Sequence, residues 1–216
     1  MRKKLDFQIF DRKSISIPYD WCNFRIFSFT GSGNDKEIIN EFIKSKYYKV
    51  SFVCPYENEK YDIDYHGPYF IDKITEDKYV KINNEIITNA LKIVIINESY
   101  VYKNGKDQHL SEKIKPTENK NIDYNTIINE YKNIWKTDKR ANVMQMDYDE
   151  FDKFLEQYNS IINDLLTENT NTYYLDLNYE NKEYLTECYW VLTYFYDYIL
   201  IDYKNSKLIN ITFGLD

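Results

Sequence analysis

The chain has 216 residues, a formal net charge of −7 at neutral pH, 43% hydrophobic residues and a large share of tyrosine, with 23 Tyr. So many large side chains exclude an intrinsically disordered chain, which buries too little apolar surface to offset the entropy lost on folding. The length suits one domain. We expect a single domain over residues 1–216, with a possible soft boundary in the polar segment 104–121.

The first part of the chain is predicted to form strands around one helix. Residues 15–17 and 24–29 alternate between apolar and polar side chains, which is the period of a half-buried strand. Asn34, followed three residues later by Glu37, resembles a capping box, and apolar residues then recur at helical spacing. We therefore expect a helix over residues 35–46.

The middle of the chain, from residue 49 to residue 103, is predicted to form antiparallel strands. Aromatic and β-branched runs at 50–54, 61–65 and 86–102 are separated by proline, glycine and asparagine turn formers. The stretch 104–121 is polar and charged and contains glycine and proline. We expect it to be a surface loop.

Two amphipathic helices and a second group of strands are predicted for the rest of the chain. Apolar side chains share one helical face after Asp123 and another over residues 148–165. Residues 172–177 alternate as a strand, residues 182–192 fit either a helix or a strand, and residues 194–213 read as a hairpin. The expected fold class is α+β, with a mainly antiparallel sheet packed against about three to four helices.

The acidic residues are concentrated toward the C-terminus. Residues 141–216 contain 14 Asp or Glu and four Lys, a net charge of −10, whereas residues 1–140 carry a net charge of +3. About half of the tyrosines lie in the same C-terminal stretch. Tyrosine supplies rigid contact area, and carboxylates steer a basic partner. This pattern favours a basic protein partner over a nucleic acid, whose binding depends on Lys and Arg.

The sequence offers little for redox, metal or cofactor chemistry. Cys22, Cys54 and Cys188 are odd in number and widely spaced, so we expect buried free thiols rather than disulfides or a CxxC pair. The two histidines, His66 and His109, are too few for a histidine-based metal cluster. We expect no cofactor and no metal. No uninterrupted apolar stretch has the length of a signal peptide core or a membrane span, so the expected location is the cytoplasm.

Two short motifs bear on catalysis. Gly31-Ser32-Gly33 precedes a predicted helix, but it lacks the third glycine of a dinucleotide site and the lysine of a P-loop, and the acidic first turn would repel a phosphate. Asp202-Tyr203-Lys204 has the acid-x-Lys order of many metal-dependent nucleases. The nearest second carboxylate, Asp197, lies five residues earlier, an offset that places it on the opposite face of a strand.

The C-terminal run Trp190-Val-Leu-Thr-Tyr-Phe-Tyr-Asp197-Tyr-Ile-Leu-Ile-Asp202, continued by a second strand to Phe213, resembles the tail of bacterial immunity proteins. These proteins neutralise toxins of polymorphic or contact-dependent interbacterial competition systems. The resemblance implies a small acidic cytoplasmic protein without enzymatic activity, whose partner is a toxin domain.

We therefore expect a non-enzymatic binding protein that neutralises a basic toxin domain through an acidic, tyrosine-rich C-terminal surface. The candidate partner-binding residues are Asp147, Asp149, Glu150, Tyr173, Asp176, Glu180, Glu183, Glu187, Asp197 and Asp202. Two alternatives stay open. One is a metal-dependent nuclease or hydrolase of a mobile-element or phage-defence system, and the other is an acidic mimic of nucleic acid that blocks a DNA-binding enzyme. The sequence does not define the oligomeric state.

Overall fold

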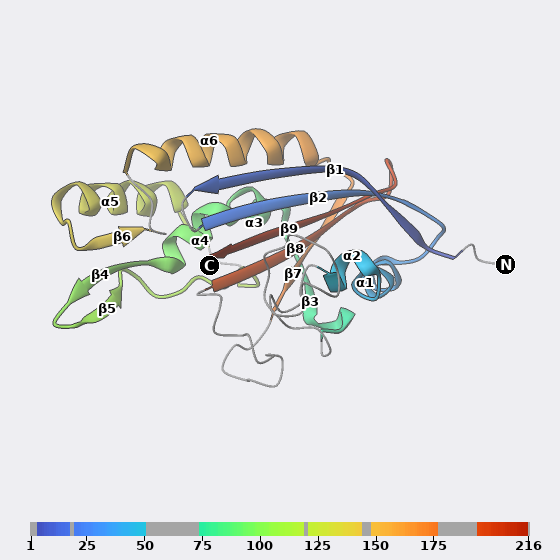
Figure 1. Cartoon of the computed structure of the whole chain (residues 1–216), viewed down its shortest axis with the longest axis horizontal. Coiled ribbons are helices and arrows are strands. Elements are labelled where there is room, and N and C mark those ends of the chain that lie inside the picture. The colour runs from blue at the N-terminus through green and yellow to red at the C-terminus, as the bar shows by residue number, and fades with distance from the viewer. Residues whose placement is uncertain are drawn as a thin grey trace.

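The structure, a computed structural model, describes residues 4–17, 20–50, 74–118, 121–143, 148–176 and 194–215. In this part of the chain a six-stranded antiparallel sheet carries helices on both faces, and a three-stranded sheet lies at one end (Figure 1). The predicted α+β class with a mainly antiparallel sheet is confirmed.

The strands are β1 (Asp6–Ile17), β2 (Asp20–Thr30), β3 (Tyr79–Ile82), β4 (Ser99–Lys103), β5 (Lys106–His109), β6 (Ala141–Val143), β7 (Thr170–Leu175), β8 (Tyr194–Asp202) and β9 (Lys207–Leu215). The helices are α1 (Asp35–Ile43), α2 (Lys46–Val50), α3 (Asn84–Thr88), α4 (Ala90–Glu98), α5 (Tyr124–Thr137) and α6 (Tyr148–Leu165).

The large sheet joins the two ends of the chain. Its strand order is β1-β2-β9-β8-β7-β3, so the N-terminal hairpin pairs with the C-terminal hairpin through β2 and β9. Their antiparallel register runs from Asp20 opposite Leu215 to Ser28 opposite Lys207. The predicted C-terminal hairpin is confirmed as β8 and β9. The small sheet has the order β5-β4-β6.

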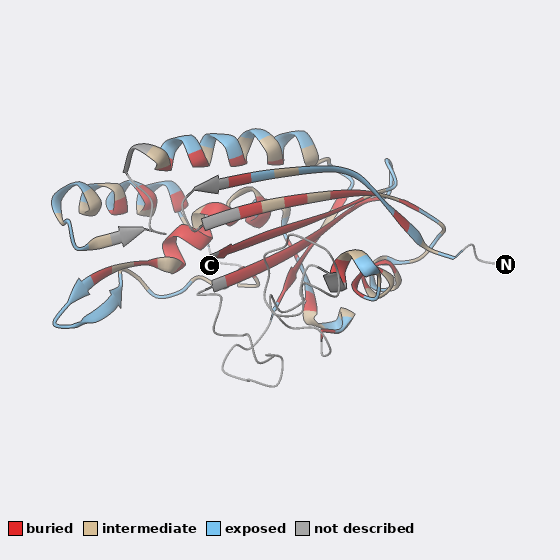
Figure 2. Cartoon of the chain, in the orientation of Figure 1, coloured by how far each residue is buried: buried red, intermediate tan, exposed pale blue. Residues whose placement is uncertain are grey.

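Side chains alternate along each strand, so the large sheet has an apolar core on each face. On one face, Phe24, Tyr198 and Phe213 pack with residues of α3 to α6. On the other face, Phe27 and Ile199 pack with residues of α1 and α2. Figure 2 shows the central strands buried and the outward side of α6 largely exposed or intermediate.

The helix α1 begins where the sequence predicts, with its capping box present, but it ends at Ile43 rather than at the predicted residue 46. The backbone N–H of Glu37 donates to Asn34 Oδ1 at 3.0 Å, and the backbone N–H of Asn34 donates to Glu37 Oε2 at 2.8 Å. Gly31 before the helix has φ of 100°, a conformation that glycine adopts without steric cost. The prediction of a cap at Asp123 is also confirmed, because its carboxylate accepts from the Thr126 N–H at 3.1 Å.

The prediction of a strand over residues 86–102 is wrong for most of its length. The segment forms α3 and α4, and only Ser99–Lys103 is a strand. The side chain of Asn83 starts α3 by accepting the Glu85 N–H at 2.7 Å. In α4, the consecutive residues Ile93 to Ile96 are all fully buried, so the helix has no polar face and its sequence shows no helical period.

Two further boundaries differ from the prediction. Val50, expected in a strand, ends the short helix α2. Lys106–His109, expected in a surface loop, pairs with β4 as the exposed strand β5. The predicted strand 61–65 and the ambiguous segment 182–192 lie outside the described residues. Within the described part of the chain, no helix combines the length and apolarity required to cross a membrane.

Asn34→Ala is predicted to lower the free energy of unfolding by about 1 kcal/mol, because α1 loses the side chain that accepts the Glu37 N–H. Urea denaturation measures the change. The matched control is Asn40→Ala in the interior of the same helix, which should leave stability unchanged or slightly higher because alanine favours helix. Equal losses in the two variants would contradict this role for Asn34.

Candidate functional site

The predicted partner-binding residues do not form one surface. Tyr173, Asp197 and Asp202 are buried, with exposed fractions of 8%, 1% and 2%, which removes them from the exposed surface that the sequence predicts. Asp176 is exposed just after β7, and Glu150 is half-buried in the first turn of α6. Asp147, Glu180, Glu183, Glu187 and the side chain of Asp149 lie outside what the structure describes.

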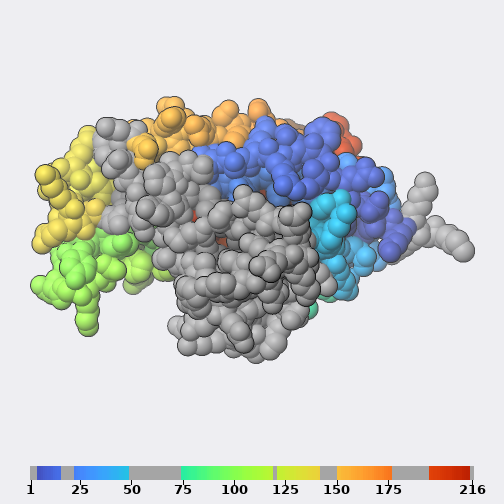
Figure 3. Space-filling view, in the orientation of Figure 1, coloured from blue at the N-terminus to red at the C-terminus, as the bar shows by residue number. Residues whose placement is uncertain are grey.

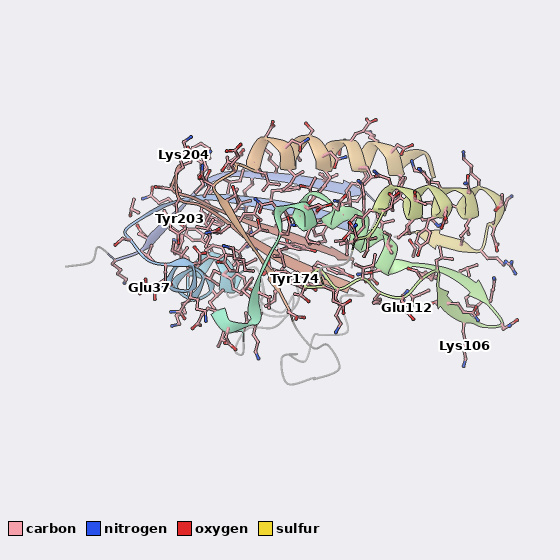
Figure 4. All side chains as sticks on the ribbon, turned by 180° about the vertical axis from the view of Figure 1, so that it is seen from behind. Glu37, Lys106, Glu112, Tyr174, Tyr203 and Lys204 are labelled. Atoms are coloured by element: carbon pink, nitrogen blue, oxygen red, sulfur yellow. The ribbon has the colours of Figure 1, made fainter. Side chains whose placement is uncertain are left out.

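The expected tyrosine-rich surface is not found among the described C-terminal residues, because most of their tyrosines are buried. Tyr158, Tyr174, Tyr196 and Tyr198 are buried on the face of the sheet that α3 to α6 cover. The ring of Tyr174, which Figure 4 labels, has its centroid 5.2 Å from that of Tyr198. Tyr203, on the turn between β8 and β9, is 42% exposed. Most of the described C-terminal tyrosines therefore supply core packing rather than contact area for a partner.

Asp197 lies at the centre of a buried polar cluster on the α1 and α2 side of the sheet. The Tyr79 hydroxyl donates to Asp197 Oδ2 at 2.5 Å, and the Tyr48 hydroxyl lies 3.1 Å from the same oxygen and 2.7 Å from the Tyr79 hydroxyl. The side-chain amide of Asn210 donates to Oδ1. The Arg25 guanidinium donates to Asn210 Oδ1 and, at 3.2 Å, to the backbone oxygen of Tyr47.

Burial dominates the ionisation of this cluster. It raises the pKa of Asp197 to about 6, although the Tyr79 hydrogen bond and the Arg25 charge both favour the carboxylate. It lowers the pKa of Arg25 to about 10, against the opposing effect of Asp197. The pKa values of Tyr48 and Tyr79 are raised by burial and then by the nearby Asp197 charge. At neutral pH the cluster therefore holds a carboxylate and a guanidinium with Asn210 between them.

The geometry assigns the Asp197 cluster a structural role. A buried carboxyl group with a pKa near neutrality has the acidity of a general acid or base. However, both of its oxygens accept hydrogen bonds from protein groups, which come from β3, β9 and α2. The cluster joins these elements to β8 and, through Arg25, to β2.

Asp202 holds the turn of the C-terminal hairpin. Its carboxylate accepts from the backbone N–H of Asn205 at 3.2 Å and from the Asn205 side-chain amide at 2.6 Å. Asp197 lies on the opposite face of β8, as the odd offset predicts, since Ile199 and Leu200 contribute to different cores. Within the described residues, no group of three or more His, Cys, Asp or Glu could hold a metal ion. This arrangement does not support a nuclease site built on Asp202.

Protein groups occupy the space at the start of α1, directly after the glycine motif. Asp35 accepts hydrogen bonds from Asn171 Nδ2 at 3.0 Å, from the Tyr203 hydroxyl at 2.5 Å and from the Tyr173 hydroxyl. Burial, followed by the bond to Asp35, raises the pKa of Tyr203. Figure 4 shows Tyr203 and Glu37 at the same end of the molecule. Hydrogen bonds to Asp35 thus join the start of α1 to β7 and to the hairpin turn. The Asp35 carboxylate occupies the place where a phosphate would have to bind.

Exposed acidic residues occur on several described elements, among them Asp11 on β1, Asp107 on β5 and Glu130 on α5, and four lie on α6 and the turn after it. We name Asp152, Glu156, Asp164 and Glu168, all exposed, the α6 acidic face. Lys153 is the one lysine among the exposed residues of α6, and Asp152 pairs with Lys132 of α5. The sequence prediction did not include these four residues. The helical period could have found them, because the buried Phe151, Phe154, Tyr158 and Ile162 define the opposite side of the helix.

The chain matches no known protein family, no curated protein and no solved structure. Its candidate site therefore rests on the geometry above.

Cys22, the one cysteine among the described residues, is a buried free thiol, and burial raises its pKa.

Asp197→Asn should change the pH dependence of stability. An unfolded aspartate has a pKa of about 3.9, so the folded-state value of about 6 means that the folded protein binds this proton more tightly. The contribution of Asp197 to the free energy of unfolding is fully present below the unfolded pKa. It is lost as the pH rises through about 6. The free energy of unfolding of the variant, relative to the natural chain, should therefore rise by about 2 kcal/mol between pH 4 and pH 7.5.

Urea denaturation at the two pH values measures this difference, and a pH-independent difference would contradict it.

Tyr79→Phe should raise the pKa of Asp197. It removes a hydrogen bond that favours the carboxylate, so the pKa of Asp197 should rise further in an NMR titration of its carboxyl carbon.

Proposed function

We propose that this chain is a non-enzymatic binding protein whose α6 acidic face contacts a basic protein partner. The observation that carries the proposal is the division of the carboxylates. Asp35, Asp197 and Asp202 are bound by protein groups inside the fold, whereas the α6 acidic face is exposed on α6 and the turn after it. Such a surface attracts a basic partner and raises its rate of association.

The proposed partner is a toxin domain that the chain neutralises by covering its surface. The resemblance of the C-terminal run to immunity proteins supplies this class of partner, and the net charge of −7 agrees with it. A cytoplasmic location belongs to the same proposal. The half-buried Glu150 precedes the α6 acidic face in the first turn of the helix. Asp147 and Asp149, which the sequence predicts as partner-binding residues, belong to the same proposal.

The partner can be tested directly, because an immunity gene is expected directly downstream of its toxin gene. Expression of the product of the upstream reading frame should arrest growth, and co-expression of this chain should restore it. The two purified proteins should form a complex. If the upstream product were a DNA-binding enzyme, and if DNA and this chain competed for the same surface of it, the chain would be a nucleic-acid mimic. If the two proteins formed no complex, the proposed partner class would fail.

Glu156→Lys combined with Asp164→Lys should slow association with this partner about tenfold at low ionic strength, because exposed charges act mainly on the rate of encounter. The difference should shrink at high salt, where exposed charges are screened. Stopped-flow fluorescence over a series of salt concentrations measures both effects.

The matched control is Asp107→Lys, which reverses an exposed carboxylate on β5. It should leave the rate and its salt dependence unchanged. The role of the α6 acidic face would be refuted by equal effects of the control and the α6 variant.

A further inference from the structure

The outer edge of β1 is open within the described part of the chain. This strand has 12 residues and ends the large sheet, and β2 is its only strand partner there. Residues 8–12 are all exposed, and so is Ser14. An edge strand presents unpaired N–H and C=O groups that can pair with another chain.

A β-bulge near the middle of β1 places an aromatic ring at the surface. The register passes from Ile9 opposite Phe27 to Asp11 opposite Ile26, so Phe10 has no residue opposite it on β2. Phe10 is 66% exposed and the neighbouring Ile9 is 38% exposed. The Nζ of Lys207 lies over this ring, 5.1 Å from its centroid. From Asp11 to Ile17 the strand then continues in unbroken register with β2.

Helix α6, which carries most of the α6 acidic face, lies against β1. Helix α6 packs over β1, and the two elements are adjacent at the surface in Figure 3. A segment that paired with β1 would therefore run beside α6, the helix that carries Asp152, Glu156 and Asp164. The exposed carboxylates favour lysine or arginine on the side of that segment that faces the helix.

We propose that β1 accepts an extended basic segment of the partner protein as an additional strand of the large sheet, with Phe10 as its apolar anchor. The proposal rests on the proposed function and specifies how the partner is held. Backbone hydrogen bonds to the regular stretch from Asp11 to Ile17 supply affinity, the ring of Phe10 packs against an apolar side chain, and the α6 acidic face selects a basic sequence.

The same charges disfavour a second copy of this chain as the occupant. Antiparallel pairing of two β1 strands about a two-fold axis would keep the helix layers of both copies on the same side of one continuous sheet. The two α6 acidic faces would then lie near each other across the axis, and like charges would repel. A basic strand from another protein meets no such repulsion.

The test uses a synthetic ten-residue peptide of alternating lysine and valine, with a glutamate and valine peptide as its control. The basic peptide should slow amide hydrogen exchange at Asp11 to Ile17 of the full chain, and the acidic peptide should not. Phe10→Ser should weaken binding of the basic peptide about tenfold. The matched control Tyr102→Ser removes another exposed aromatic ring, 52% exposed on β4, and should leave binding unchanged.

Three results would overturn the inference: no protection of β1 by the basic peptide, equal effects of the Phe10 and Tyr102 variants, or a dimer in sedimentation that Phe10→Ser dissociates. The combined Glu156 and Asp164 reversal separates the inference from the proposed function. If the reversal weakens complex formation with the upstream gene product while Phe10→Ser does not, the inference fails and the proposed function stands. If the reversal has no effect either, both fail.

Discussion

The buried carboxylate of Asp197 constrains the rest of the sheet. It is 1% exposed and is bound by Tyr79, Tyr48 and Asn210, with Arg25 one hydrogen bond further away. Loss of one partner from such a group costs about 3–5 kcal/mol when a charge is left buried. A one-residue shift of β8 would also move Asp197 to the opposite face, into the core that Tyr198 and Phe213 now fill. The cluster therefore fixes the register of the central strands, and with it the position of the outer strand β1.

The carboxylates discussed above fall into two groups. Asp35, Asp197 and Asp202 each join elements that are distant in sequence or close a turn, so their charge is used inside the fold. The α6 acidic face lies on a helix whose inner side is anchored by Phe154 and Tyr158. Rigid anchoring of this helix beside β1 places a charged surface and an open strand edge next to each other, which is the combination that the proposed binding of a basic segment requires.

Local signals predicted local structure well. The Asn34 and Glu37 pair, the Asp123 cap and the C-terminal hairpin each depend on residues close in sequence, and all three are confirmed. Residues 86–98 were misassigned because a helix buried on every side lacks the amphipathic period that identifies helices. Asp197 was assigned to the surface because an aspartate within an alternating strand resembles a solvent-facing residue. Its network could not be predicted, since Arg25 and Asn210 are separated by 185 residues.

We propose that the buried carboxylates maintain the fold and that the α6 acidic face binds the partner. To test this division, the free energy of unfolding and the affinity for the upstream gene product are both measured at pH 7.5 in two variants, Asp197→Asn and Glu156→Lys. We expect Asp197→Asn to change stability and leave affinity unchanged, and Glu156→Lys to weaken affinity and leave stability unchanged. Loss of affinity in the Asp197 variant at unchanged stability, with none in the Glu156 variant, would contradict the account.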